Sequence, residues 1–104
     1  MRALEEKKAE SILLLDVQGF CSFADYFVLC TGSSDRMLRA LAEVVAETAH
    51  QEGKKPARLE GHAVNGWILV DMGSVVAHIL SPQRREYYDL EQLWKEAKKL
   101  IQIQ

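Results

Sequence analysis

Two apolar runs near the middle of the chain, residues 67–70 (WILV) and 75–80 (VVAHIL), flank the short stretch Asp71-Met72-Gly73-Ser74. Gly73 can adopt the positive φ that a tight connection requires, so this segment predicts a β-hairpin. A symmetric loop of two or four residues predicts these cross-strand pairs: Val70 with Val75, Leu69 with Val76, Ile68 with Ala77, and Trp67 with His78.

Because side chains alternate along a strand, the two faces of this hairpin differ in character. One face is wholly apolar and is expected in a core; it carries Ile68, Val70, Val75, Ala77 and Ile79. The other face is mixed and carries Trp67, Leu69, Asp71, Ser74, Val76 and His78. We interpret the mixed face as a surface and as the first place to look for function.

Before the hairpin, the pattern predicts one short helix and two strands. Residues 1–10 are charged and rich in helix formers, with Leu4 as the sizeable apolar anchor, and predict a short amphipathic helix. Residues 11–17 (SILLLDV) form a continuous apolar run, typical of a strand covered on both faces. Residues 23–31 (FADYFVLCT) predict a second strand that can pair with the first as another hairpin.

A long amphipathic helix follows the second strand. Residues 32–35 (GSSD) have helix-start chemistry, since Ser and Asp side chains accept hydrogen bonds from free backbone N–H groups. Gly53 is expected to end the helix and Pro56 to block its continuation. Apolar residues recur at helical spacing between these signals, at Met37, Leu38, Leu41, Val44, Val45 and Ala49.

The last part of the chain predicts a polar connector and a final helix. Residues 57–60 predict a short third strand before the hairpin, and residues 81–88 (SPQRREYY) a connector after it. Asp89 is expected to open the final helix, with Gln92 in capping-box position. Its apolar stripe is expected to contain Leu90, Leu93, Trp94, Ala97, Leu100 and Ile101.

The element order is therefore αββαβββα within one domain spanning residues 1–104. A helical crossover after the second strand requires at least one parallel pairing, whereas the two hairpins are antiparallel. We predict an α+β (mixed α/β) fold with a mixed sheet of about five strands, two main helices and a short N-terminal helix.

Composition narrows the classes of function. A formal net charge of −2 and a pI near 5.9 argue against a domain that grips nucleic acid through general electrostatics. The chain has no apolar run long enough to span a membrane, and its charged N-terminus lacks the apolar core of a signal peptide. Cys21 and Cys30 form no C-x-x-C pair, which favours reduced thiols in a cytoplasmic protein.

Catalytic chemistry is weakly supported. Gly32-Ser33 at a strand-to-helix junction is suited to an anion and is similar to the start of the nucleotidyltransferase site. That site needs clustered carboxylates for magnesium, and the candidates Glu60 and Asp71 are single residues on different strands. A plain helix cap is therefore the favoured interpretation. The three histidines have no metal-ligand spacing, so we expect no metal and no cofactor.

Aromatic and basic residues gather near the hairpin instead. Trp67 is either a core residue under a helix or a surface anchor of the kind that Trp, Tyr and Arg supply in interfaces. The run Arg84-Arg85-Glu86-Tyr87-Tyr88 adjoins the strand that carries His78; the alternative is a solvated turn with Tyr88 in the core. Taken together, these residues are typical of a surface for a protein partner, or for a protein partner seated on RNA.

Five stretches of the chain form a distinctive series: residues 25–36 (DYFVLCTGSSDR), 59–61 (LEG), 66–73 (GWILVDMG), 75–80 (VVAHIL) and 85–94 (REYYDLEQLW). In this order they resemble the ribosomal silencing factor family, also called Iojap. The resemblance covers nearly the whole chain, and the combination is specific although each stretch is short. Many members have Asp where this chain has Ser74, and a longer N-terminal helix than residues 1–10.

The resemblance implies a nucleotidyltransferase-like fold without enzymatic activity, in a cytoplasmic protein that needs no cofactor. It implies binding to large-subunit ribosomal protein fourteen, which blocks joining of the small subunit and lowers translation when nutrients are scarce. It leaves open a homodimer and a peripheral contact with ribosomal RNA. The partner-binding residues that it implies are Trp67, Asp71, His78, Arg85, Tyr88 and Leu90. The alternative is a magnesium-dependent nucleotidyltransferase that uses Gly32, Ser33, Glu60 and Asp71.

Overall fold

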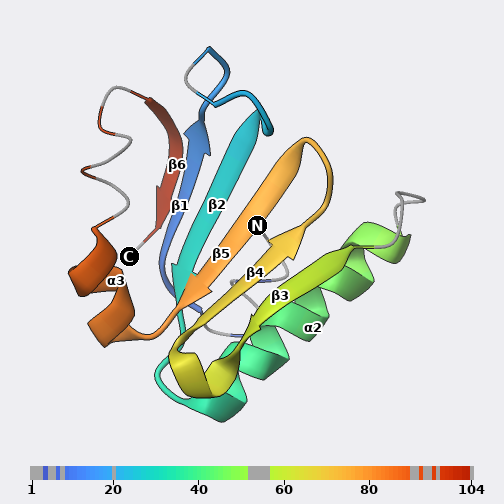
Figure 1. Cartoon of the computed structure of the whole chain (residues 1–104), viewed down its shortest axis with the longest axis vertical. Helices are drawn as coiled ribbons and strands as arrows, with labels where there is room; N and C mark the ends of the chain where they lie inside the picture. The colour runs from blue at the N-terminus through green and yellow to red at the C-terminus, as the bar shows by residue number, and fades with distance from the viewer. Residues whose placement is uncertain are drawn as a thin grey trace.

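The computed structural model describes Leu4, Lys7, Gln92, Lys95 and residues 9–19, 21–51, 57–89 and 97–103. The described elements are β1 (Glu10–Asp16), β2 (Tyr26–Thr31), α2 (Asp35–Gln51), β3 (Arg58–His62), the 3₁₀ turn η1 (Ala63–Asn65), β4 (Trp67–Asp71), β5 (Val75–Leu80), α3 (Pro82–Tyr88) and β6 (Lys98–Ile103) (Figure 1). Together they form an α+β fold around one mixed β-sheet, as predicted.

The sheet has six strands in the order β3-β4-β5-β2-β1-β6, rather than about five. β2 and β5 run parallel, and every other neighbouring pair is antiparallel. The parallel pairing predicted from the helical crossover is therefore confirmed, as is the hairpin between the first two strands. After β2 the chain forms α2, then β3 and β4 at one edge of the sheet, and then β5, which lies between β4 and β2.

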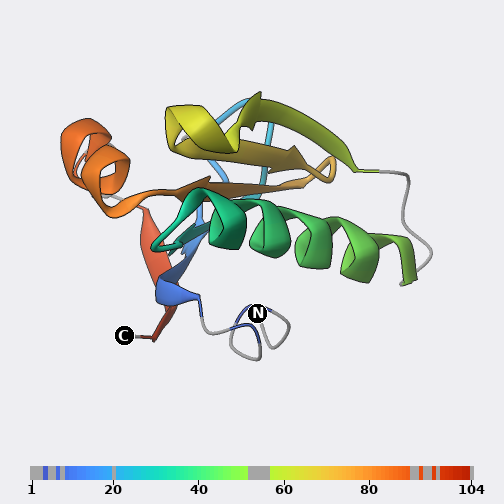
Figure 2. The same cartoon turned by 90° about the horizontal axis from the view of Figure 1, so that it is seen from below.

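Helix α2 packs on one face of the sheet, against β4 and β5 (Figure 2). The Ser34 hydroxyl accepts a hydrogen bond of 3.1 Å from the Met37 amide, which is the predicted helix-start chemistry. The predicted stop signals, Gly53 and Pro56, lie outside the described residues. The apolar face of the hairpin is buried beneath this helix together with Ile12, Val28, Cys30, Leu38, Leu41 and Val45.

The opposite face of the sheet is also largely buried, which corrects the expectation of an open surface there. Its central side chains form a second core cluster with Val17, Ala24 and Ala97, from segments that flank the strands. The buried strand residues of this cluster are Leu13, Leu15, Phe27, Leu29, Val76 and Leu80. Only Trp67, Leu69 and Asp71, on β4, are half-buried on the mixed face of the hairpin.

The hairpin register differs from the predicted one by two residues. The loop is the two-residue Gly73-Ser74, closed by a hydrogen bond of 2.9 Å from the Met72 amide to the Val75 carbonyl. Gly73 has φ +90°, the positive value that a tight hairpin turn needs at its first position. The observed pairs are Trp67–Leu80, Ile68–Ile79, Leu69–His78, Val70–Ala77 and Asp71–Val76. A shift of two residues leaves every side chain on its predicted face.

The end of the chain differs from the prediction. Residues 82–88 form α3 instead of a connector: the Ser81 hydroxyl accepts from the Arg84 amide, Pro82 occupies the first turn, and Asp89 ends the helix with φ 46°. The expected helix from Asp89 to Ile101 is replaced at its end by β6, since pairing with β1 overrides helical propensity there. Of the expected stripe, Ala97 is buried, Leu100 and Ile101 are exposed, and Leu90, Leu93 and Trp94 lie outside the described residues.

The beginning of the chain shows a smaller difference. Leu4 is only 2% exposed and packs in the core beneath α2, consistent with its predicted anchoring role. Most of residues 1–8 lie outside the described residues, so the predicted N-terminal helix is not described. Glu10 belongs to β1 rather than to that helix, and β3 extends two residues beyond the predicted strand, to His62.

Candidate functional site

Trp67 and His78 are in direct contact on the sheet face opposite α2. Trp67 begins β4 and lies opposite Leu80, so His78 is its diagonal neighbour rather than its direct partner. The indole Nε1 of Trp67 donates a hydrogen bond of 3.3 Å to Nδ1 of His78, and the ring centroids are 5.9 Å apart. Trp67 is half-buried against the second core cluster, so part of its surface remains accessible.

The surroundings of His78 keep its imidazole neutral. The ring is 7% exposed and stands edge-on to Phe27 at a centroid distance of 4.8 Å. Burial lowers the pKa of His78 from 6.5 to about 4, because the charged form loses its hydration. Since Nδ1 accepts from the indole, the neutral ring carries its proton on Nε2. That atom is buried and has no hydrogen-bond partner among the described residues.

Arg85 lies at the same end of the sheet as Trp67. Its Nη1 donates a hydrogen bond of 3.0 Å to the hydroxyl of the buried Thr31, at the end of β2. Thr31 pairs with Leu80, and Leu80 pairs with Trp67, so Thr31 and Trp67 are two strands apart, about 10 Å. Trp67, His78 and Arg85 therefore lie on one side of the sheet, with Thr31 and Leu80 between Arg85 and Trp67.

Arg84, the residue before Arg85, ties α3 to the segment that leads into β4. Its Nε donates a hydrogen bond of 2.9 Å to the carbonyl of Asn65. The Ser81 amide donates to the Gly66 carbonyl at 2.8 Å, which adds a second link at the same place. Gly66 has φ +79°, and a Cβ there would lie 2.7 Å from Cγ of Arg84. The backbone just before Trp67 is thus fixed by α3.

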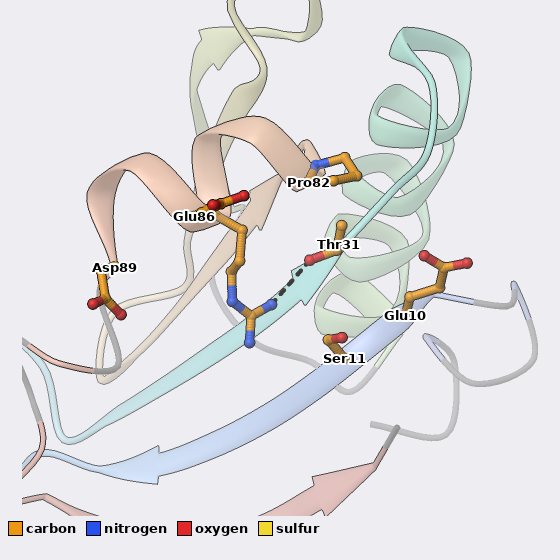
Figure 3. A pocket seen from close by; sticks show the side chains of 7 residues that line it. Glu10, Ser11, Thr31, Pro82, Glu86 and Asp89 are labelled. Carbon is orange, nitrogen blue, oxygen red and sulfur yellow. Dashed lines mark hydrogen bonds between the residues drawn. The ribbon is translucent and has the colours of Figure 1, made fainter.

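A hollow of about 420 Å³ opens beside Arg85 (Figure 3). Ser11 and Thr31 supply hydroxyl groups on the side of the strands, and the remaining walls come from α3 and the start of β1. The charged residues that line it are Arg85, Glu10, Glu86 and Asp89, so three carboxylates surround one guanidinium. This balance disfavours a phosphate group, and the Arg85–Thr31 bond acts there as a structural tie.

The remaining predicted site residues are not gathered with Trp67. Asp71 shares its face but stands at the other end of β4, about 13 Å away along the strand. Its carboxylate accepts a hydrogen bond of 2.9 Å from the Gly73 amide, so it stabilises the hairpin turn. Tyr88 is the last residue of α3, but its side chain lies outside the described part of the structure, as does the whole of Leu90.

The nucleotidyltransferase alternative has no assembled site in this fold. Gly32 follows β2 at the Trp67 end of the sheet, packed against Leu38 and Met37 of α2. Asp71 lies at the opposite end and on the opposite face from α2. Glu60, in the middle of β3, is exposed and forms an ion pair of 3.9 Å with Arg58. Within the described residues, no three His, Cys, Asp or Glu side chains are placed to hold a metal ion.

Sequence reasoning missed two residues on this face of the sheet. Thr31 was predicted only as the end of a strand, and its role as the acceptor for Arg85 depends on a contact between positions 54 residues apart. Phe23 was predicted as strand, but it precedes β2, is 68% exposed and contacts Phe27 at a centroid distance of 6.0 Å. The exposure of Phe23 beside the buried Phe27 is a property of the folded structure, and hydrophobic periodicity in the sequence does not reveal it.

Comparisons with known proteins agree on one family. The family model described as "Ribosomal silencing factor during starvation" matches residues 1–104. The Ribosomal silencing factor RsfS of Bacillus subtilis is 41% identical over 95 residues, which are 91% of this chain and 80% of that protein. The mouse protein named Mitochondrial assembly of ribosomal large subunit protein 1 is 33% identical over 94 residues, 88% of this chain and 41% of that protein.

A crystal structure of a Chromobacterium violaceum protein has the same fold. It superposes with a TM-score of 0.85 at 38% sequence identity, covering 90% of this chain and 78% of that one. No helix in the described part of the chain is long and apolar enough to cross a membrane. The sequence motifs, the mixed sheet and the full-length family match lead to one conclusion: this chain belongs to the ribosomal silencing factor family.

Proposed function

We propose that this protein binds the large ribosomal subunit through ribosomal protein fourteen and prevents the small subunit from joining it. Translation is thereby lowered when nutrients are limited. The proposal rests first on family membership, and the name of the mouse relative refers to the large ribosomal subunit. A protein that acts in this way works in the cytoplasm, where bacterial ribosomes are.

The observation that carries the proposal is that Trp67 is partly accessible and is held in one orientation. A tryptophan that keeps accessible surface while its ring is held in one orientation is well suited to anchor a protein interface, since little side-chain freedom is lost on binding. Trp67 meets both conditions, because His78 accepts from its indole and the second core cluster supports one side of the ring. His78 then acts by positioning Trp67, and Arg85 supplies a basic group at the same end of the sheet.

This mode of action is binding without turnover. The protein occupies a surface of the large subunit, and its steric overlap with the small subunit prevents the two subunits from joining. Gly32, Glu60 and Asp71 are dispersed over the sheet, which favours this mode over nucleotide transfer. Any contact with ribosomal RNA is peripheral to the protein contact.

Co-sedimentation with isolated large subunits tests the proposal. Trp67→Ala combined with Arg85→Ala is expected to abolish binding that the wild type shows, because truncation of an anchor aromatic costs on the order of 2–4 kcal/mol. Leu59→Ala is the matched control, since Leu59 is 50% exposed and pairs with Val70 on the α2 side of the sheet. Equal binding by the double variant and the control would contradict the proposed surface.

A further inference from the structure

An aromatic row crosses the sheet on the face opposite α2. It consists of Phe23, Phe27, His78 and Trp67, with successive centroid distances of 6.0, 4.8 and 5.9 Å. Its two middle rings are buried, with Phe27 2% and His78 7% exposed. Both ends reach the surface, Trp67 at the α3 end and Phe23 at the end near the β4–β5 turn.

Phe23 is the more exposed end of the aromatic row, at 68%. Burying a phenylalanine side chain is favourable, so one left largely open beside a second aromatic ring is a ready contact point. The backbone around it is well fixed: the Asp25 amide donates to the Ser74 carbonyl at 2.7 Å, and the Val17 amide donates to the Asp25 carbonyl at 2.9 Å. Phe23 therefore sits on a segment tied to the sheet on both sides.

Three carboxylates lie around this end, on Asp16, Asp25 and Asp71. In the strand register Lys98 lies opposite Asp16, Lys99 opposite the neighbouring Leu15, and Arg58 opposite Asp71. Arg58 also forms an ion pair of 3.9 Å with Glu60. Asp25 is exposed and forms no ion pair with any residue that the structure describes. The exposed carboxylate of Asp25, two residues from the exposed ring of Phe23, fits a basic side chain and repels the phosphates of RNA.

We propose that Phe23 is a second anchor of the partner surface, and that it receives a lysine or arginine side chain of a basic partner protein. The apolar stem of that side chain packs on the Phe23 ring, while its charge faces Asp25. This inference rests on the proposed function and extends it, because it gives the partner surface two anchors at the two ends of the aromatic row. It also assigns this end to protein rather than to RNA.

The test measures the affinity of the full chain for isolated large subunits as a function of salt. Phe23→Ser is expected to weaken binding by about tenfold or more, as for other interface aromatics, and Phe23→Leu by less. Asp25→Asn is expected to weaken binding severalfold and to flatten the salt dependence. Leu59→Ala, on the other face, is expected to bind like the wild type. Thermal melts and light scattering confirm that each variant is folded and unchanged in mass.

The contrary outcomes are distinct. Wild-type affinity in Phe23→Ser, alongside lost binding in Trp67→Ala, would overturn the second anchor and leave the proposed function standing. Tighter binding by Asp25→Asn would show that this end meets RNA phosphates, which contradicts a basic protein contact. A change of mass in Phe23→Ser without a change in affinity would assign Phe23 to self-association instead. Unchanged affinity in both Trp67→Ala and Phe23→Ser would count against the proposed function itself.

Discussion

The indole Nε1 of Trp67 donates a hydrogen bond of 3.3 Å to Nδ1 of His78, across the diagonal of the β4–β5 pair. This contact joins Trp67, a predicted partner-binding residue, to His78, which is buried on the same face of the sheet. It fixes the orientation of the tryptophan and the tautomer of the histidine together. Both consequences can be measured.

A double-mutant cycle tests the contact itself. Trp67→Phe removes the donor and His78→Leu removes the acceptor, and each is expected to lower the free energy of unfolding by about 1–3 kcal/mol. Because the two residues interact directly, the double variant should lose less than the sum, by about 1 kcal/mol. Urea unfolding followed by circular dichroism gives the four values. Strict additivity would show that the hydrogen bond contributes nothing to stability.

The depressed pKa of His78 predicts a pH dependence of stability. The unfolded histidine titrates near pH 6.5 and the folded one near 4, so the unfolded state binds more protons between these values. Stability should therefore fall as the pH drops from about 6.5 to 4, by about 3 kcal/mol in total from this residue. Below pH 4, protonated Nδ1 can no longer accept from Trp67. Unfolding experiments at several pH values measure the effect.

His78→Gln is the control for this titration, because glutamine keeps a hydrogen-bond acceptor but has no proton to gain. The slope of unfolding free energy against pH should be smaller in His78→Gln than in the wild type between pH 4 and 6.5. Equal slopes in the two proteins would mean that other groups, and not His78, account for the acid sensitivity.

Two glycines with positive φ predict different costs for the same substitution. Gly66→Ala places a Cβ 2.7 Å from Cγ of Arg84 and 2.8 Å from Oγ of Ser81, whereas Gly73→Ala meets no atom within 4 Å. Both changes carry the conformational cost of about 1–2 kcal/mol for a left-handed residue. Gly66→Ala should cost about 1 kcal/mol more because of the clash. Thermal or urea melts measure the loss of unfolding free energy in each variant. Equal losses in Gly66→Ala and Gly73→Ala would show that α3 moves aside freely.

Cys30 should be inert in the folded protein. It is fully buried, and burial raises the pKa of its thiol to about 12, so it stays protonated at pH 8. In a Cys21→Ser variant, a thiol reagent should modify the protein only as fast as it opens or unfolds. Modification of the native variant at the rate of a small free thiol would contradict this picture. Mass spectrometry follows the reaction.

Hydrophobic periodicity predicted the central part of the fold correctly. Strand Val75–Leu80, helix Asp35–Gln51 and the two faces of the hairpin follow from local pattern and capping chemistry, which a single sequence displays. The hairpin register was wrong by two residues, since the turn is centred on Gly73-Ser74, where the Asp71 carboxylate accepts from the Gly73 amide, and not on Met72-Gly73. The faces were still correct, because a shift of two keeps the alternation.

The prediction failed where distant contacts decide. Residues 98–103 have a helix-compatible pattern but form β6, since β1 offers an open edge for pairing. The burial of His78 and the contact of Arg85 with Thr31 likewise arise from segments far apart in the chain. For the candidate surface, the sequence named Trp67, His78 and Arg85, but it indicated neither their mutual geometry nor the exposure of Phe23.

Joining of ribosomal subunits in the presence of this protein tests the central claim most directly. Light scattering records the association of purified small and large subunits after the large subunits are incubated with wild type, Trp67→Ala or Leu59→Ala. We expect the wild type and Leu59→Ala to suppress joining, and Trp67→Ala to need about thirtyfold higher concentration for the same effect. Undiminished joining with the wild type, or equal suppression by Trp67→Ala, would contradict the account.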